Sequence, residues 1–166
     1  MSDEQSTAGG AEAGDGRRFQ IQKVYLKDVS FESPAAPGIF SADTDVQPQV
    51  SLQLNTESQR VGESLYDITL AVTVTGATDE RTLFLVEVKQ SGLFLVEGFD
   101  DEERGHLIGA YSPSVLFPFA REVVADLVQK GGLPQLVLQP INFDAVYAQH
   151  RQRQGGEAAD APDGGH

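Results

Sequence analysis

The feature that most constrains the fold is a strict alternation of apolar and polar residues over positions 66–75. Apolar side chains recur at every second position, at Tyr66, Ile68, Leu70, Val72 and Val74. Because successive side chains of a β-strand point to opposite faces, this pattern predicts a strand with one covered face and one open face. Such alternation is typical of an antiparallel sheet, because parallel strands are covered on both faces.

Three other segments show strand patterns. Residues 19–31 alternate from their first residue, and one phase contains Phe19, Ile21, Tyr25, Val29 and Phe31. A second strand follows Gln47-Pro-Gln and places Val50, Leu52 and Leu54 on one face. A further strand is expected over 83–90, and Ser91-Gly92 separates it from a short apolar run at 93–96.

The second half of the chain has helical periodicity. Ser112-Pro-Ser114 supplies a cap and a first-turn proline, and apolar residues recur at helical spacing until Gly131-Gly132. Prolines keep residues 133–140 extended, and Asn142 is placed to cap a last helix. These elements predict an α+β fold, a four-stranded antiparallel sheet with two helices packed on one face.

Both ends lack the apolar residues of a folded core. Residues 1–18 and 150–166 are rich in Ser, Ala, Gly, Asp and Glu, and they bury too little apolar surface to offset the entropy of ordering. We therefore expect a disordered N-terminal tail at 1–18, one domain at 19–149 and a disordered C-terminal tail at 150–166.

The net charge of −13, from 25 acidic and 12 basic residues, restricts the partners. Residues 19–149 hold 18 acidic and eight basic residues, so −10 of this charge belongs to the expected domain. An acidic domain is unsuited to nucleic acid and to an anionic membrane surface. No apolar run approaches the ~20 residues of a membrane span, and the absence of cysteine fits a reducing compartment. We expect a soluble cytoplasmic protein without direct membrane insertion.

The chain shows no sign of an active site, a cofactor site or a metal site. None of its three histidines, His106, His150 and His166, lies in a catalytic or zinc-binding motif. The acidic run Asp100–Glu103 lacks the ligand alternation of a calcium loop, so we interpret it as the N-terminus of a helix. These observations predict a protein that is not an enzyme.

Two features suggest binding surfaces. In the strand at 83–90, Leu85 and Glu87 lie on the face that we expect to be exposed to solvent. Either Leu85 is a stray exposed leucine, or the two residues belong to an acidic patch with an apolar centre that binds a basic partner. Aromatic residues and prolines also gather in irregular segments, where they either complete the core or line a groove for extended apolar peptide.

A series of segments between Phe19 and Tyr147 matches one known family in sequence and in order. They include Phe19-Gln-Ile-Gln-Lys-Val-Tyr-Leu-Lys-Asp-Val-Ser-Phe-Glu-Ser-Pro, Phe84-Leu-Val-Glu-Val-Lys-Gln-Ser-Gly-Leu-Phe, Leu116-Phe-Pro-Phe-Ala-Arg-Glu and Pro140-Ile-Asn-Phe-Asp-Ala. With these segments the chain resembles the SecB family of protein-export chaperones. Val46 stands where relatives carry a tryptophan, so one wall of the client groove is expected to be less aromatic.

The resemblance implies a homotetramer, a dimer of dimers, that holds unfolded precursor proteins and passes them to the SecA motor ATPase. It implies that SecA docks on an acidic sheet face, whose matching positions are Asp28, Glu32, Leu85 and Glu87. The expected function is that of a cytosolic export chaperone that keeps precursors unfolded and translocation-competent.

Clients are expected to bind through distributed apolar contacts. The candidate groove residues are Phe31, Phe40, Phe117, Leu133, Ile141, Phe143 and Tyr147. An alternative is a carrier of a small apolar ligand, and a tetramer that suppresses aggregation would distinguish the chaperone from a monomeric carrier.

Overall fold

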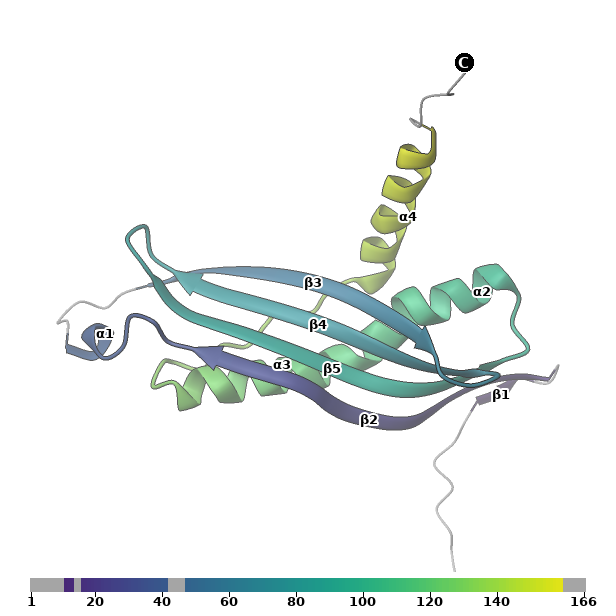
Figure 1. Cartoon of the computed structure of the whole chain (residues 1–166), viewed down its shortest axis with the longest axis horizontal. Coiled ribbons are helices and arrows are strands. Elements are labelled where there is room, and N and C mark those ends of the chain that lie inside the picture. Colours follow the sequence, from purple (N-terminus) through teal and green to yellow (C-terminus); the bar gives the residue numbers. More distant parts are fainter. Residues whose placement is uncertain (1–10, 14–15, 42–46, 160–166) are drawn as a thin grey trace, which may run out of the picture.

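The computed structural model describes residues 11–13, 16–41 and 47–159, so Val46 lies outside the described residues. The elements are β1 (Ala11–Ala13), β2 (Arg17–Glu32), α1 (Gly38–Ser41), β3 (Gln49–Arg60), β4 (Leu65–Ala77), β5 (Thr82–Glu97), α2 (Asp101–His106), the π-helical turn η1 (Leu107–Tyr111), α3 (Ser112–Lys130) and α4 (Phe143–Ala159). The strands form one antiparallel sheet in the order β1-β2-β5-β4-β3 (Figure 1). The predicted α+β fold is confirmed, and the three-residue β1 is added to the four expected strands.

The core lies between α3 and the central strands β4 and β5. The apolar phase of β4 predicted from the sequence, Ile68, Leu70, Val72 and Val74, is at most 1% exposed. It packs with Val86, Val88 and Phe94 of β5 and with Leu116 and Val124 of α3. In Figure 1, α3 runs behind the sheet along these strands. One sheet face is therefore covered by α3, and we call the other the open face.

The phase predicted for β2 is wrong in its middle. Two irregularities in the pairing with β5, between Ile21 and Lys23 and between Leu26 and Asp28, shift the register. Since a one-residue shift moves a side chain to the other face, Tyr25 lies opposite Ser91 on the open face. The other predicted members of this phase do share one face, the one toward α3: Phe19, Ile21, Val29 and Phe31.

Strand β5 continues through the dipeptide Ser91-Gly92, which the sequence suggested as a break. A Cβ atom at Gly92 would lie 2.5 Å from the Phe94 ring and 3.1 Å from Leu116 of α3. The glycine is thus required by the close approach of α3 to the sheet, not by a turn.

The long helical segment begins earlier than the sequence predicted. Asp100 caps α2 by accepting from the backbone N–H of Glu103 at 2.8 Å, and the Glu103 side chain accepts from the backbone N–H of Asp100. This capping box confirms that the acidic run starts a helix. Helix α3 begins at Ser112 with a first-turn proline, as predicted. The expected cap at Ser112 is wrong, because α2 and η1 run into α3 without a gap, and Pro118 lies inside α3.

The last helix begins where it was expected and extends further. Asn142 accepts from the backbone N–H of Ala145 at 3.1 Å, so the predicted cap is present. Helix α4 continues to Ala159, into the segment predicted to be disordered. Its side chains at 148–156 are exposed, so hydrogen bonds along the helix, propagated from a packed first turn, sustain this part.

Part of the predicted N-terminal tail also joins the fold. The backbone of β1 pairs with Arg17–Phe19 of β2 after a turn at Gly16, whose φ is +75°. Strand pairing uses backbone groups and needs no apolar side chain, so a criterion based on composition misses it.

Candidate functional site

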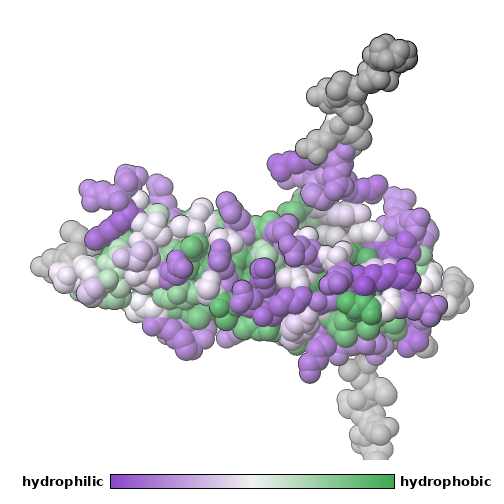
Figure 2. Space-filling view, viewed as in Figure 1, coloured by the Kyte–Doolittle hydropathy of each residue, from purple (hydrophilic) through white to green (hydrophobic). Residues whose placement is uncertain are grey.

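The open face carries the four residues expected to contact SecA. In the register of β2 and β5, Glu32 is paired with Leu85, and the neighbours of this pair along the strands are Ser30 with Glu87 and Asp28 with Lys89. The three carboxylates are exposed and Leu85 is partly buried. We call Asp28, Glu32, Leu85 and Glu87 the acidic sheet surface. Figure 2, viewed toward the open face, shows hydrophilic and hydrophobic side chains interspersed over the strands.

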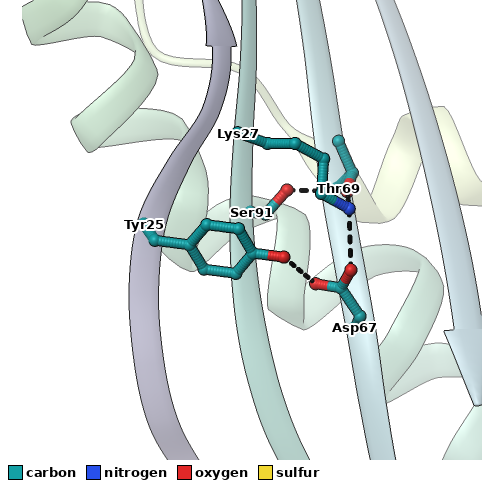
Figure 3. A network of polar contacts seen from close by, with 5 residues as sticks. All are labelled: Tyr25, Lys27, Asp67, Thr69 and Ser91. Carbon is teal, nitrogen blue, oxygen red and sulfur yellow. Dashed lines mark hydrogen bonds and ion pairs between the residues drawn. The ribbon is translucent and has the colours of Figure 1, made fainter. Parts of the chain in front are cut away.

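A polar network, which the sequence did not suggest, lies next to this surface on the open face. Lys27 donates to Asp67 at 2.7 Å and to Thr69 at 3.2 Å, and the Tyr25 hydroxyl donates to the other oxygen of Asp67 at 2.7 Å. Beneath them, Thr69 and Ser91 share a buried hydrogen bond of 2.7 Å. Figure 3 shows Tyr25 and Lys27 reaching from β2 over β5 toward Asp67 on β4. We call these five residues the Lys27–Asp67 network.

The network shifts both ionisation equilibria toward the charged forms. The hydrogen bond from Lys27 to Asp67 raises the pKa of Lys27 and outweighs desolvation. Desolvation alone would raise the pKa of Asp67, but the hydrogen bonds from Lys27 and Tyr25 and the Lys27 charge together lower this pKa below 3.8. The pair is therefore charged over the whole neutral range.

The candidate client residues divide into two groups at opposite ends of α3. At its C-terminal end, a Cβ atom at Gly131 would meet the Phe31 ring at 2.3 Å, and one at Gly132 would meet the Phe40 ring at 3.1 Å. Leu133 follows directly and is partly buried, while Phe40 is 55% exposed. We call Phe31, Phe40 and Leu133 the first apolar cluster.

The second group surrounds the start of α4. The rings of Phe117 and Phe143 meet edge to face at 5.6 Å, and both side chains are buried. Tyr147 packs on η1 so closely that a Cβ atom at Gly109 would lie 2.5 Å from its ring. Phe143 and Tyr147 line a cavity of about 400 Å³ that also touches Leu54 of β3. Phe117, Phe143 and Tyr147 form the second apolar cluster, and Ile141 packs against the core just before it.

The two clusters are separated by most of the length of α3. Gly131 follows Phe117 by fourteen positions, which is about 20 Å along a helix. The structure therefore places the seven candidates at two sites and not in one groove.

Exposed apolar side chains beside α3 were not identified as a surface from the sequence. Ile21, Leu26 and Val29 of β2 are 42%, 44% and 39% exposed, although they point to the same face as α3. Val50 and Leu52 of β3 are 43% and 38% exposed on that face. Alternation identified the face for most of these residues, but it could not show that one helix covers only the central strands.

Comparison with known proteins places this architecture in a family. The family model for the preprotein translocase subunit SecB matches residues 12–154. The protein-export protein SecB of Nitrosococcus oceani is 47% identical over 96% of this chain and 98% of that protein. The protein of the same name from Alcanivorax borkumensis is 54% identical over 86% of this chain and 92% of that protein.

A solved structure has the same fold. The SecB-like chaperone Rv1957 of Mycobacterium tuberculosis, in complex with a ChAD peptide from the HigA1 antitoxin, aligns with a TM-score of 0.56 at 19% identity. The alignment covers 75% of this chain and 88% of that one. No helix within the described residues is long and apolar enough to cross a membrane.

The sequence matches span nearly the whole chain, and the relatives are named as export chaperones and not as enzymes or small-ligand carriers. This chain belongs to the SecB family of protein-export chaperones.

Proposed function

We propose that this export chaperone holds unfolded precursor proteins on its two apolar clusters and delivers them to the motor ATPase SecA through the acidic sheet surface. The observation that carries the proposal is the contiguity of Asp28, Glu32, Leu85 and Glu87 on the open face. The apolar clusters contact α3, on the other side of the sheet. Client and motor thus have separate surfaces.

The three exposed carboxylates attract a basic partner surface, and Leu85 supplies an apolar contact at their centre. We expect Glu87→Lys to weaken SecA binding at least about tenfold, because like charges juxtaposed in an interface cost several kcal/mol. Glu57→Lys is the matched control, since Glu57 is an exposed carboxylate of β3 opposite Thr69. Equal affinities of the two variants in titrations at low salt would contradict the SecA assignment.

The apolar clusters are suited to unfolded chains, which expose apolar stretches that folded proteins bury. Two weak sites about 20 Å apart, repeated in an oligomer, give avidity along one extended client. We expect Phe40→Ala combined with Tyr147→Ala to reduce suppression of client aggregation in light scattering. Val61→Ala, at an exposed apolar site outside both clusters, should leave it unchanged.

The exposed apolar side chains beside α3 support assembly into a homotetramer, a dimer of dimers. Ile21, Leu26 and Val29 form a row on the β2 flank of α3, larger than single exposed residues require. Native mass spectrometry tests this assembly, and Leu26→Asp should shift the population toward smaller species, because it buries a charge in the contact.

We infer that the protein works in the cytoplasm, which is consistent with its acidic and cysteine-free sequence. Cell fractionation tests this inference. We also propose that residues 19–149 form the chaperone domain and that the tail at 150–166 contributes to SecA binding. Truncation after Gln149 followed by SecA titration tests the role of the tail.

A further inference from the structure

We propose that the Lys27–Asp67 ion pair is a positioning element for the acidic sheet surface. It holds the Lys27 ammonium group away from Asp28, Glu32 and Glu87, so that a basic partner meets carboxylates that Lys27 does not compensate. This inference rests on the proposed function, because it concerns the same docking event, and it gives a role to residues outside that surface.

The register shift in β2 between Leu26 and Asp28 places Lys27 on the open face beside Asp28. Asp28 is paired with Lys89 on the open face, and Lys27, in the shifted register next to it, reaches Asp67 and Thr69 on the same face. A lysine therefore stands directly beside a carboxylate of the docking surface. Its long flexible side chain could otherwise turn toward that surface.

The ion pair directs the Lys27 side chain along the sheet, away from the acidic sheet surface. Its acceptors Asp67 and Thr69 are paired with Leu93 and Ser91 of β5, whereas Glu87 precedes Ser91 by four residues on that strand. At the rise of a β-strand, the ammonium group lies on the order of 13 Å along β5 from the level of Glu87. Figure 3 shows the Lys27 side chain extended across β5 toward β4.

The acceptor is itself fixed. The Asp67 side chain is 14% exposed and receives hydrogen bonds from both Lys27 and Tyr25 at 2.7 Å. The Lys27 ammonium also lies 5.8 Å from the centre of the Tyr25 ring. Several groups thus constrain Lys27, in contrast to a single exposed ion pair, whose geometry is weakly held.

Removing the negative charge of Asp67 should therefore weaken SecA binding. Asp67→Asn keeps a hydrogen-bonding side chain but removes the charge that holds Lys27. We expect SecA affinity to fall about threefold, the size typical of one exposed charge–charge interaction. Lys27→Met combined with Asp67→Asn should restore the wild-type affinity, because no free ammonium group remains.

Glu57→Gln is the matched control. Glu57 is paired with Thr69 on the open face, so this variant makes the same change of net charge beside the network but leaves the ion pair intact. Circular dichroism establishes that each variant is folded. If Asp67→Asn binds SecA as well as Glu57→Gln does, or if the double variant binds no better than Asp67→Asn, the proposal is wrong.

A second measurement uses the wild-type protein without SecA. Limited acetylation with an N-hydroxysuccinimide ester, followed by mass spectrometry, reports the reactivity of each lysine. Lys23, Lys27 and Lys89 are all exposed, but Lys27 is held in the ion pair with Asp67, so we expect it to react several times more slowly than the other two. Equal rates would overturn the proposal even if a variant failed to fold. Failure of SecA to bind the wild type would instead count against the proposed function.

Discussion

At the scale of single residues, environment separates side chains that are chemically alike. Lys27 and Lys89 both lie on the open face, but only Lys27 has a carboxylate with 14% exposure as its partner. Phe40 and Phe143 are both aromatic groove candidates, but Phe40 is 55% exposed and Phe143 is 5% exposed. Burial and hydrogen-bond partners therefore decide the role of each residue.

The Asp67 carboxylate should make stability depend on pH. Its pKa in the folded protein is lowered below 3.8, so its stabilising effect is present above 3.8 and is lost as pH falls through the lowered value. Urea titrations at several pH values should show wild type more stable than Asp67→Asn at pH 7, with a difference that shrinks below about pH 3.8. A constant difference between pH 7 and pH 2 would contradict this expectation.

The two phenylalanines should respond differently to truncation. Phe143→Ala removes a buried ring packed on Phe117, and we expect a loss of about 3–5 kcal/mol in the free energy of unfolding. Phe40→Ala should lose much less, because half of its surface is already in water. Thermal unfolding of both variants checks the ranking, and similar losses would show that Phe40 is also a core residue.

At the scale of elements, packing overrides local sequence signals. The sequence suggested a break at Gly92 and a helix start at Ser112, and both residues lie inside continuous structure. Gly92 lies under α3, where a Cβ atom has no room. Ser112 follows residues 101–111, which are already helical, so it has no free helix end to cap.

The contact of α3 with β5 makes Gly92 intolerant of substitution. We expect Gly92→Ala to destabilise the protein by about 1–3 kcal/mol, because the Phe94 ring and Leu116 must move in a packed core. Gly155→Ala is the control, since its added Cβ atom meets nothing within 4 Å and alanine favours a helix. Denaturant unfolding compares them, and equal stabilities would show that α3 moves away at little cost.

At the scale of the whole molecule, one chain leaves apolar surface uncovered on both flanks of α3. Ile21, Leu26 and Val29 lie on one flank, and Val50 and Leu52 on the other. Helix α4 stands away from the sheet, and only its first turns are packed (Figure 1). This shape is suited to an assembled subunit.

Thermal stability should therefore depend on protein concentration. If subunits cover these flanks in solution, the unfolding midpoint rises with protomer concentration, because association stabilises only the folded state. Calorimetry over a hundredfold range of concentration tests this, and Leu26→Asp should weaken the dependence. A midpoint that does not change with concentration would contradict the proposed tetramer.

The sequence by itself determined the face assignments of β4 and β5, the order of the long strands before the long helices and the acidic run that caps α2. These follow from side-chain period and capping, which are local properties. The sequence also placed Leu85 and Glu87 on one face, because residues two apart on a strand point to the same face.

Only the tertiary structure decided the rest. The register shifts of β2 placed Tyr25 and Lys27 over Asp67, because the pairing of distant strands sets which residues become neighbours. The separation of the client candidates into two clusters likewise depends on which ends of α3 meet β2 and α4. Such contacts join residues far apart in the chain, and no local period encodes them.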